Sequence, residues 1–203
     1  MDALLAGLLG FVSGSIPFGL LLTRAAGLGD VRKIGSGSIG ATNVLRTGHK
    51  GLAAATVLLD AAKGAIPVIL AGMYFALDGT GQTREFAMGL AAIGAVAGHC
   101  FTPWLKFKGG KGFATAAGIC LALAWPVMLA SAVIWAATLA VSRISSVSSM
   151  TTVVLAPLVA LGLGYRSVTM PLLAIAVIVL VQHRANIGRL MRGEEPRVGG
   201  KKD

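Results

Sequence analysis

Long apolar segments separated by short polar ones make up most of this chain. In order, the apolar segments cover residues 3–23, 51–77, 86–104, 112–141, 150–163 and 168–181. Several of them carry almost no charge, as an α-helix that crosses a lipid bilayer requires. The pattern therefore predicts a bundle of membrane-spanning helices.

The apolar segment 112–141 is interrupted by Trp125 and Pro126. Proline lacks a backbone donor and clashes with the preceding turn, so a helix ends or kinks there. We predict a hairpin of two short helices, each shorter than the ~20 residues that a perpendicular span needs. The chain is thus expected to be an all-α polytopic membrane protein with about seven transmembrane helices, some short, in a single domain over residues 1–203.

Composition supports this class. Of 203 residues, 55% are hydrophobic, and the mean hydropathy is +0.79. A soluble domain of this length needs more polar surface. Residues 3–23 show no convincing signal-peptide cleavage site, so we expect this segment to be retained as a span.

The net charge of +10 is distributed on one side of the predicted bundle. Residues 24–50, 105–111, 142–149 and 182–203 hold 15 of the 18 Lys and Arg residues. With seven spans these four segments share a face, and the positive-inside rule makes that face cytoplasmic. The N-terminus is then outside and the C-terminus cytoplasmic. This distribution argues against a nucleic-acid partner.

A lysine–glycine loop lies in residues 107–113, where Lys108 and Lys111 flank Gly109 and Gly110. Backbone N–H groups without side chains can approach anionic oxygens, and ammonium groups neutralise their charge. The loop is not a Walker A motif, which needs Ser or Thr where Gly112 stands. An ordinary basic turn beside anionic lipid is the alternative, and Lys106 fits that alternative.

A second glycine-rich segment, residues 35–46, has the G-x-G-x-x-G spacing at Gly35, Gly37 and Gly40. A dinucleotide site needs a preceding strand, and an apolar span with a charged linker precedes this segment. What remains is a loop rich in N–H and hydroxyl donors that ends at Arg46. Arginine binds phosphate oxygens through its planar fork. For Arg46, phosphate binding and an ordinary positive-inside turn both stay open.

Two further polar segments lie on the same predicted face. Residues 142–149 combine serines with Arg143, and composition alone favours a helix-capping loop there. If residues 183–194 are helical, His183 and Asn186 share a face and form a candidate site. No carboxylate pair or His/Asp/Glu cluster indicates a catalytic metal, so no metal site is expected.

Residues 35–46, 98–115 and 183–194 resemble the signature motifs of the bacterial integral-membrane acyl-phosphate:glycerol-3-phosphate acyltransferases, the PlsY family. The similarity extends to Asp60, Lys63 and Ser142-Arg143, and spans nearly the whole chain. Ser38 departs from the family, which commonly has Asn there.

The resemblance implies transfer of a fatty acyl group from acyl phosphate to the 1-hydroxyl of glycerol 3-phosphate. The products are lysophosphatidic acid and phosphate, in phospholipid biosynthesis. The expected partners are the two substrates and membrane lipid, without a cofactor. The expected location is the bacterial inner membrane, with the active site facing the cytoplasm.

On this basis the expected catalytic residues are Ser36, Arg46, His99, Lys108, Lys111 and Asn186. The expected substrate-binding residues are Gly37, Ser38, Asn43, Gly109, Gly110, Ser142 and His183. Together they would hold two phosphates while the glycerol hydroxyl attacks directly, without an acyl-enzyme. Lysine or N–H donors near the glycine pair would stabilise the oxyanion. The proton goes to His99 or to a donor phosphate oxygen, and the sequence leaves both open.

Two other classes compete with this interpretation. A phosphate-ester transporter would also need cations in a helical bundle, but near mid-membrane and not at one interface. A non-catalytic lipid-binding protein would explain the basic face but not the paired glycines. We also expect the short helices of residues 112–141 to leave a groove through which the acyl chain enters from the membrane.

Overall fold

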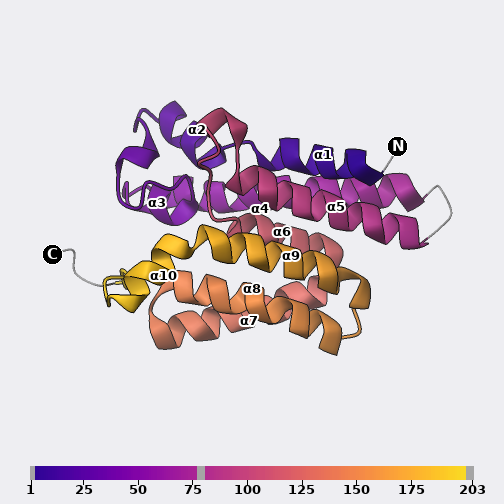
Figure 1. Ribbon diagram of the computed structural model, residues 1–203. Helices are drawn as coiled ribbons and strands as arrows, with labels where there is room; N and C mark the ends of the chain where they lie inside the picture. Colours follow the sequence, from indigo (N-terminus) through magenta and orange to yellow (C-terminus); the bar gives the residue numbers. More distant parts are fainter. Residues whose placement is uncertain (1–2, 77–80, 200–203) are drawn as a thin grey trace.

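The computed structural model describes residues 3–76 and 81–199, and the regular structure in this part of the chain is helical. Its helices are α1 (Ala3–Gly14), α2 (Phe18–Ala25), α3 (Ala41–Leu45), α4 (Lys50–Ala76), α5 (Gly81–Cys100), α6 (Phe113–Leu123), α7 (Trp125–Ser142), α8 (Ser145–Gly162), α9 (Arg166–Gln182) and α10 (Arg184–Met191), with short 3-10 turns at Val31–Lys33 and Pro103–Leu105. Helices α1, α4 and α5 pack together on one side of the bundle, and α7, α8 and α9 on the other (Figure 1). Helix α6 packs on α4. The two sides of the bundle are joined where α5 packs against α9.

The all-α membrane fold is confirmed. Five segments of the described chain are long and apolar enough to cross a membrane, and the α9–α10 pair, bent by 58°, would be a sixth. Helix α6 is apolar but only 11 residues long. The count of seven spans and the orientation of the termini stay predictions. Some positions used in the prediction lie outside the described residues: Leu77, residues 78–80, Lys201 and Lys202.

The predicted hairpin in residues 112–141 is present. Helix α6 ends at Leu123 and α7 begins at Trp125, with Pro126 in its first turn. There the missing proline N–H costs nothing, because the first N–H groups of a helix have no intrahelical partner. The proline thus separates the two helices, as the sequence predicts.

The first apolar segment is one candidate span, Ala3–Ala25, as predicted, and it is built from two helices, α1 and α2. Pro17 cannot continue a hydrogen-bonded helix, and the break between α1 and α2 exposes backbone carbonyls that side chains satisfy. Thr102 Oγ1 donates to the Ser15 carbonyl at 2.5 Å. Lys63 Nζ donates to the Ile16 carbonyl at 2.7 Å. The break is therefore fixed by α4 and by the turn after α5.

The predicted polar loop at residues 142–149 is also shorter than expected. Helix α7 runs to Ser142 and α8 begins at Ser145, so only Arg143 and Ile144 connect them. The serines of this segment thus belong mostly to the first turns of α8. Composition alone predicts a loop at such a segment, because Ser is common both in loops and at the start of helices.

Glycines let α1 and α5 approach closely. Gly10 and Gly14 on α1 face the α5 backbone at Ala91 and Ala95, and a side chain at either glycine would overlap the carbonyl oxygen opposite. Gly94 and Gly98 on α5 meet the α1 backbone in the same way. This is the small-residue packing by which membrane helices associate.

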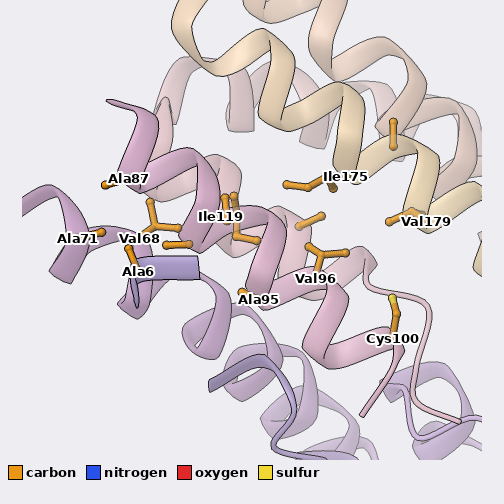
Figure 2. Close-up of a cluster of buried hydrophobic side chains, with 14 of the residues drawn as sticks. Ala6, Val68, Ala71, Ala87, Ala95, Val96, Cys100, Ile119, Ile175 and Val179 are labelled. Atoms are coloured by element: carbon orange, nitrogen blue, oxygen red, sulfur yellow. The ribbon is translucent and has the colours of Figure 1, made fainter. Parts of the chain in front are cut away.

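The core behind these glycines is built from small side chains. Figure 2 shows Ala6, Ala71, Ala87 and Ala95 between the helices, with Ile119 of α6 among the larger side chains. Many large apolar side chains instead point outward, including Leu4, Leu8, Leu58, Met73, Val133 and Val177. Such an apolar exterior fits a surface in contact with lipid.

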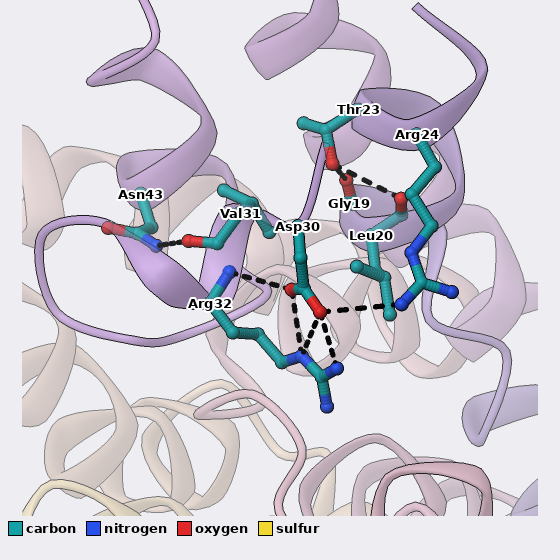
Figure 3. A network of polar contacts seen from close by, with 8 residues as sticks. All are labelled: Gly19, Leu20, Thr23, Arg24, Asp30, Val31, Arg32 and Asn43. Atoms are coloured by element: carbon teal, nitrogen blue, oxygen red, sulfur yellow. Dashed lines mark hydrogen bonds and ion pairs between the residues drawn. The ribbon is translucent and has the colours of Figure 1, made fainter. Parts of the chain in front are cut away.

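The segment between α2 and α3 is shaped by a polar network, drawn in Figure 3. Asp30 accepts from Arg32 and pairs with Arg24. The hydrogen bond from Arg32 holds the pKa of the Asp30 carboxyl well below its ordinary value. Asn43 Nδ2 donates to the Val31 carbonyl at 2.8 Å, which ties α3 to this segment.

Candidate functional site

A cavity of about 1570 Å³ opens at the end of the bundle where the four basic segments meet. Its polar wall comes from residues 34–46, Lys111, the start of α8, and residues 183–199. These segments are far apart in sequence, and the helix order returns each of them to the same end, where α3 and α10 lie (Figure 1).

Asn43 organises the wall formed by residues 34–46. Its buried side-chain amide donates to three carbonyl oxygens of the preceding segment, and Asn43 Oδ1 accepts from the Ser36 N–H at 3.0 Å. Gly35 has a φ of +53°, and a side chain there would overlap Arg46 and Asn43. Ser36 and Arg46 are therefore brought together at the cavity by one amide and one glycine.

Lys111 is the lysine of the glycine loop that lines the cavity. Burial lowers the pKa of its ammonium group; nearby Glu195 raises it, and Arg189 and Arg46 lower it further. These neighbours come from two separate segments, residues 34–46 and 183–199, so charged groups distant in sequence gather around Lys111. Lys108 is exposed and lies outside the cavity lining.

The glycine pair has a different use from the one expected. The Gly109 N–H donates to the Cys100 carbonyl at 3.1 Å, and the Gly110 N–H to the His99 carbonyl at 3.0 Å. A side chain at Gly110 would overlap the His99 ring. Both N–H groups are thus occupied in holding the loop against the end of α5, and Lys111 is the lysine of this loop that faces the cavity.

On the α4–α5 side, the cavity lining includes Asp60 and His99. His99 is 3% exposed, and its Nδ1 lies 3.8 Å from Asp60 Oδ1, too far for a hydrogen bond. Asp60 Oδ1 pairs with Lys63 Nζ at 2.7 Å. A buried acid–base pair thus stands beside the histidine.

The opposite wall is held by Glu195, a residue that the sequence did not single out. Ser146 Oγ and Asn186 Nδ2 donate to its Oε1 at 2.6 and 2.5 Å, and Arg189 Nε donates to its Oε2 at 2.7 Å. Burial would raise the pKa of this carboxyl, but these hydrogen bonds outweigh burial and lower it. The Val198 N–H also donates to the Arg143 carbonyl, so the tail is tied across the cavity edge.

Eight of the thirteen expected residues line the cavity: Ser36, Ser38, Asn43, Arg46, His99, Lys111, His183 and Asn186. Five lie outside its lining: Gly37, Lys108, Gly109, Gly110 and Ser142. The Ser142 hydroxyl instead donates to the Thr138 carbonyl at the end of α7. His183 and Asn186 do face the same cavity, as their spacing predicted.

The cavity also contains polar groups that sequence reasoning missed, among them Ser146, Ser149, Arg189 and Glu195. Ser146, Ser149 and Val153 recur at helical spacing, which would have placed them on one face if the start of α8 had been recognised. For Glu195 the sequence offered no signal, because its partners lie on two separate helices, α8 and α10.

Away from its polar mouth the cavity becomes apolar and extends between α6, α7, α8 and α9. Phe113 stacks on Trp135 at 6.2 Å between ring centroids, and Leu139, Val153 and Ile175 continue the lining. The site thus combines a cationic, hydrogen-bonding entrance with an apolar interior. Such a cavity suits a molecule with an anionic head and a hydrocarbon tail.

Comparison with known proteins gives a consistent result. A family model described as glycerol-3-phosphate acyltransferase matches residues 4–193. A glycerol-3-phosphate acyltransferase of Erythrobacter litoralis is 57% identical over 201 residues, which covers 99% of this chain and 98% of that protein. One of Mesorhizobium japonicum is 52% identical, covering 98% of this chain and 97% of that protein.

Solved structures agree. The crystal structure of PlsY, an integral membrane glycerol 3-phosphate acyltransferase, in its glycerol 3-phosphate form, has a TM-score of 0.87 and 34% identity to this chain. The alignment covers 98% of this chain and 96% of that one. The lysophosphatidic acid form gives a TM-score of 0.85 and 33% identity, with the same coverage.

Proposed function

The chain belongs to the glycerol-3-phosphate acyltransferase family, and from this membership we propose that its acyl donor is an acyl phosphate. It is an integral, multi-pass membrane protein with glycerol-3-phosphate acyltransferase activity. The proposed reaction forms lysophosphatidic acid, releases inorganic phosphate, and takes place at the cytoplasmic side of the inner membrane.

One observation carries the proposal: the cavity has a polycationic mouth and an apolar interior. Arg46, Lys111, Arg189 and Arg197 line the cavity, and four cations suit two phosphate groups better than one. Glycerol 3-phosphate brings one phosphate from water, and an acyl phosphate brings the other at the end of a hydrocarbon chain. A thioester donor on a carrier would present no phosphate next to its acyl carbonyl.

In the proposed step the 1-hydroxyl oxygen of glycerol 3-phosphate attacks the acyl carbonyl carbon. The bond between that carbon and the phosphate oxygen then breaks, and phosphate leaves with the electron pair. Holding the reactants together supplies much of the rate. We assign stabilisation of the developing oxyanion to Lys111, which lines the cavity. The mixed anhydride has a good leaving group, so no acyl-enzyme is needed.

We assign the hydroxyl proton to an oxygen of the departing phosphate. The burial of His99 and the closeness of its ring to Gly110 support this assignment. His99→Gln should then retain turnover and its pH dependence, because on this assignment His99 does not take the proton. If this variant loses turnover by several powers of ten while the substrate KM is unchanged, His99 is the group that accepts the proton.

The donor is tested with purified protein in lipid vesicles. Glycerol 3-phosphate is supplied with palmitoyl phosphate, palmitoyl-CoA or palmitoyl-acyl carrier protein, and lysophosphatidic acid and phosphate are quantified. We expect equimolar products with the acyl phosphate alone. Product formed with either thioester but not with acyl phosphate would reject the proposed donor. Arg46→Gln serves as the active-site control and should abolish the signal.

A further inference from the structure

The apolar part of the cavity ends on a defined set of side chains. Going away from the polar mouth, the last lining residues are Cys120 on α6, Met128 on α7, Ala156 on α8 and Leu172 on α9. Each of the four helices contributes one of them. The four residues, called the floor from here on, close the far end of the lining.

Behind the floor the bundle is tightly packed. Cys120, Ala156 and Leu172 belong to a core cluster that continues into Val127 and Ala160, each 0% exposed. Met128 packs against the same cluster. Protein interiors of this kind have little spare volume, so a chain that reaches the floor cannot continue through this cluster.

The depth of the apolar part, from the polar mouth to the floor, can be measured along three helices, and the three values are similar. From Leu139 to Met128 on α7 is 11 residues, and from Ser146 to Ala156 on α8 is 10. From His183 to Leu172 at α9 is again 11. At about 1.5 Å per helical residue these steps span roughly 15–17 Å.

An extended chain of single bonds advances about 1.2 Å per bond, as an extended polypeptide does, so the apolar part accommodates roughly 13 bonds. The carbonyl carbon must lie in the polar mouth near Lys111 to react. An acyl chain of about 14 to 16 carbons would therefore reach the floor.

We propose that the floor formed by Cys120, Met128, Ala156 and Leu172 limits the length of the acyl chain that this enzyme transfers efficiently. The inference rests on the proposed function only in that the apolar part of the cavity holds the acyl chain. Chains up to the limit gain from each buried methylene. Longer chains must overpack the cluster or withdraw the carbonyl from Lys111.

Each buried methylene is worth a factor of roughly four in binding. The value of kcat/KM should rise with chain length to about 14–16 carbons and then fall. The fall should follow chain length and not the critical micelle concentration of the donor. Vesicle-bound donors at a fixed mole fraction make this distinction.

The test measures kcat/KM for acyl donors of 10 to 20 carbons with four variants. Met128→Ala removes side-chain volume at the floor and should move the optimum to longer chains. Ala156→Phe fills the end of the cavity and should move it to shorter chains, with a loss of tenfold or more for palmitoyl. The matched controls are Leu129→Ala and Val154→Phe, whose parent side chains point outward, at 57% and 45% exposure; both should keep the wild-type profile.

Unchanged chain-length profiles in both floor variants would overturn the proposal, as would equal shifts in the outward controls. If Ala156→Phe does not fold, Met128→Ala decides alone, and its KM for glycerol 3-phosphate reports whether the mouth is intact. The profile is run with whichever donor class the wild-type enzyme accepts. The experiment thus distinguishes a wrong acyl donor from a wrong assignment of the residues that limit chain length.

Discussion

At the residue scale, the cations of the cavity mouth differ in how their charges are balanced. Arg189 is paired with Glu195 at 2.7 Å, and Arg46 bonds weakly to Asn43 at 3.4 Å. Among the described residues, Lys111 has no carboxylate within ion-pair distance, and burial lowers its pKa. Arg46 and Lys111 are therefore two cations of the mouth whose charges no carboxylate in the described part of the chain neutralises by direct contact.

We predict that Lys111→Gln lowers kcat/KM for glycerol 3-phosphate acylation by about 10²–10³-fold, the usual cost of losing an oxyanion donor. Lys106→Gln is the control, because Lys106 is exposed and lies outside the cavity lining. Lys108→Gln then tests the expected role of Lys108. A loss as large as that of Lys111→Gln would show that the loop moves to bring Lys108 into the site.

The lowered pKa of Lys111 also predicts an alkaline limb in the pH profile. The ammonium group is charged below its pKa, so activity should fall as pH rises through a value below the ordinary 10.5. Lys111→Arg should remove that limb, because a guanidinium stays protonated. The measurement is kcat/KM against pH in both proteins. The same limb in the arginine variant would assign it to another group.

At the scale of elements, the break between α1 and α2 and the glycine contact between α1 and α5 are linked. Close approach of α1 to α5 carries the Ser15 carbonyl to Thr102, and Trp104 Nε1 donates to the Ser15 hydroxyl at 2.9 Å. The turn after α5 then leads into the loop that presents Lys111. Packing of the first helix thus contributes to the position of a site residue.

We predict that Gly94→Ala destabilises the protein by about 1–3 kcal/mol, the typical cost of overpacking. The added methyl would overlap the Gly7 carbonyl of α1. Gly51→Ala is the matched control, a helical glycine with no atoms near the position of the new methyl. It should change stability by less than about 0.5 kcal/mol. Thermal unfolding in detergent measures both, and equal midpoints would contradict the close contact.

At the scale of the whole molecule, the cavity depends on the tail that crosses its edge. Glu195 links α8, α10 and the tail through Ser146, Asn186 and Arg189. Its contacts connect segments about 50 residues apart, since Ser146 and Glu195 differ by 49 positions. The mouth is therefore completed only when the last helices and the tail have docked.

Acid should release this tail. The lowered pKa of Glu195 means that its stabilising effect is present above the ordinary value of 4.5 and is lost as pH falls through the lower folded value. We predict that proteolysis within residues 194–199 increases below pH 4.5. Glu195→Gln should show the increased cleavage already at neutral pH and little further change in acid. Equal cleavage of both proteins at pH 7 would contradict the docking role.

How far the sequence predicts this structure differs between its parts. Hydropathy located the apolar helices and Pro126 located the hairpin, because both signals are local. The break before Pro17 was missed. It is held by contacts distant in sequence, because Thr102 and Lys63 donate to the carbonyls of Ser15 and Ile16. Motif resemblance found Ser36, Arg46, Lys111 and Asn186. It did not find Glu195, whose position in the cavity comes from tertiary contacts alone.

The pair of Asp60 and Lys63 has a consequence for how the protein enters the membrane. Its two charges lie three residues apart on α4 and only 2.7 Å from each other. Charged side chains are costly in a bilayer unless they are paired, and here both partners belong to the same helix. Helix α4 can thus leave the translocon as a neutral segment before α5 and α6, the later helices that pack on it, have been synthesised. Neutralising only one of the two residues would leave a lone charge at the insertion step and reduce the yield of inserted protein before its folded stability matters.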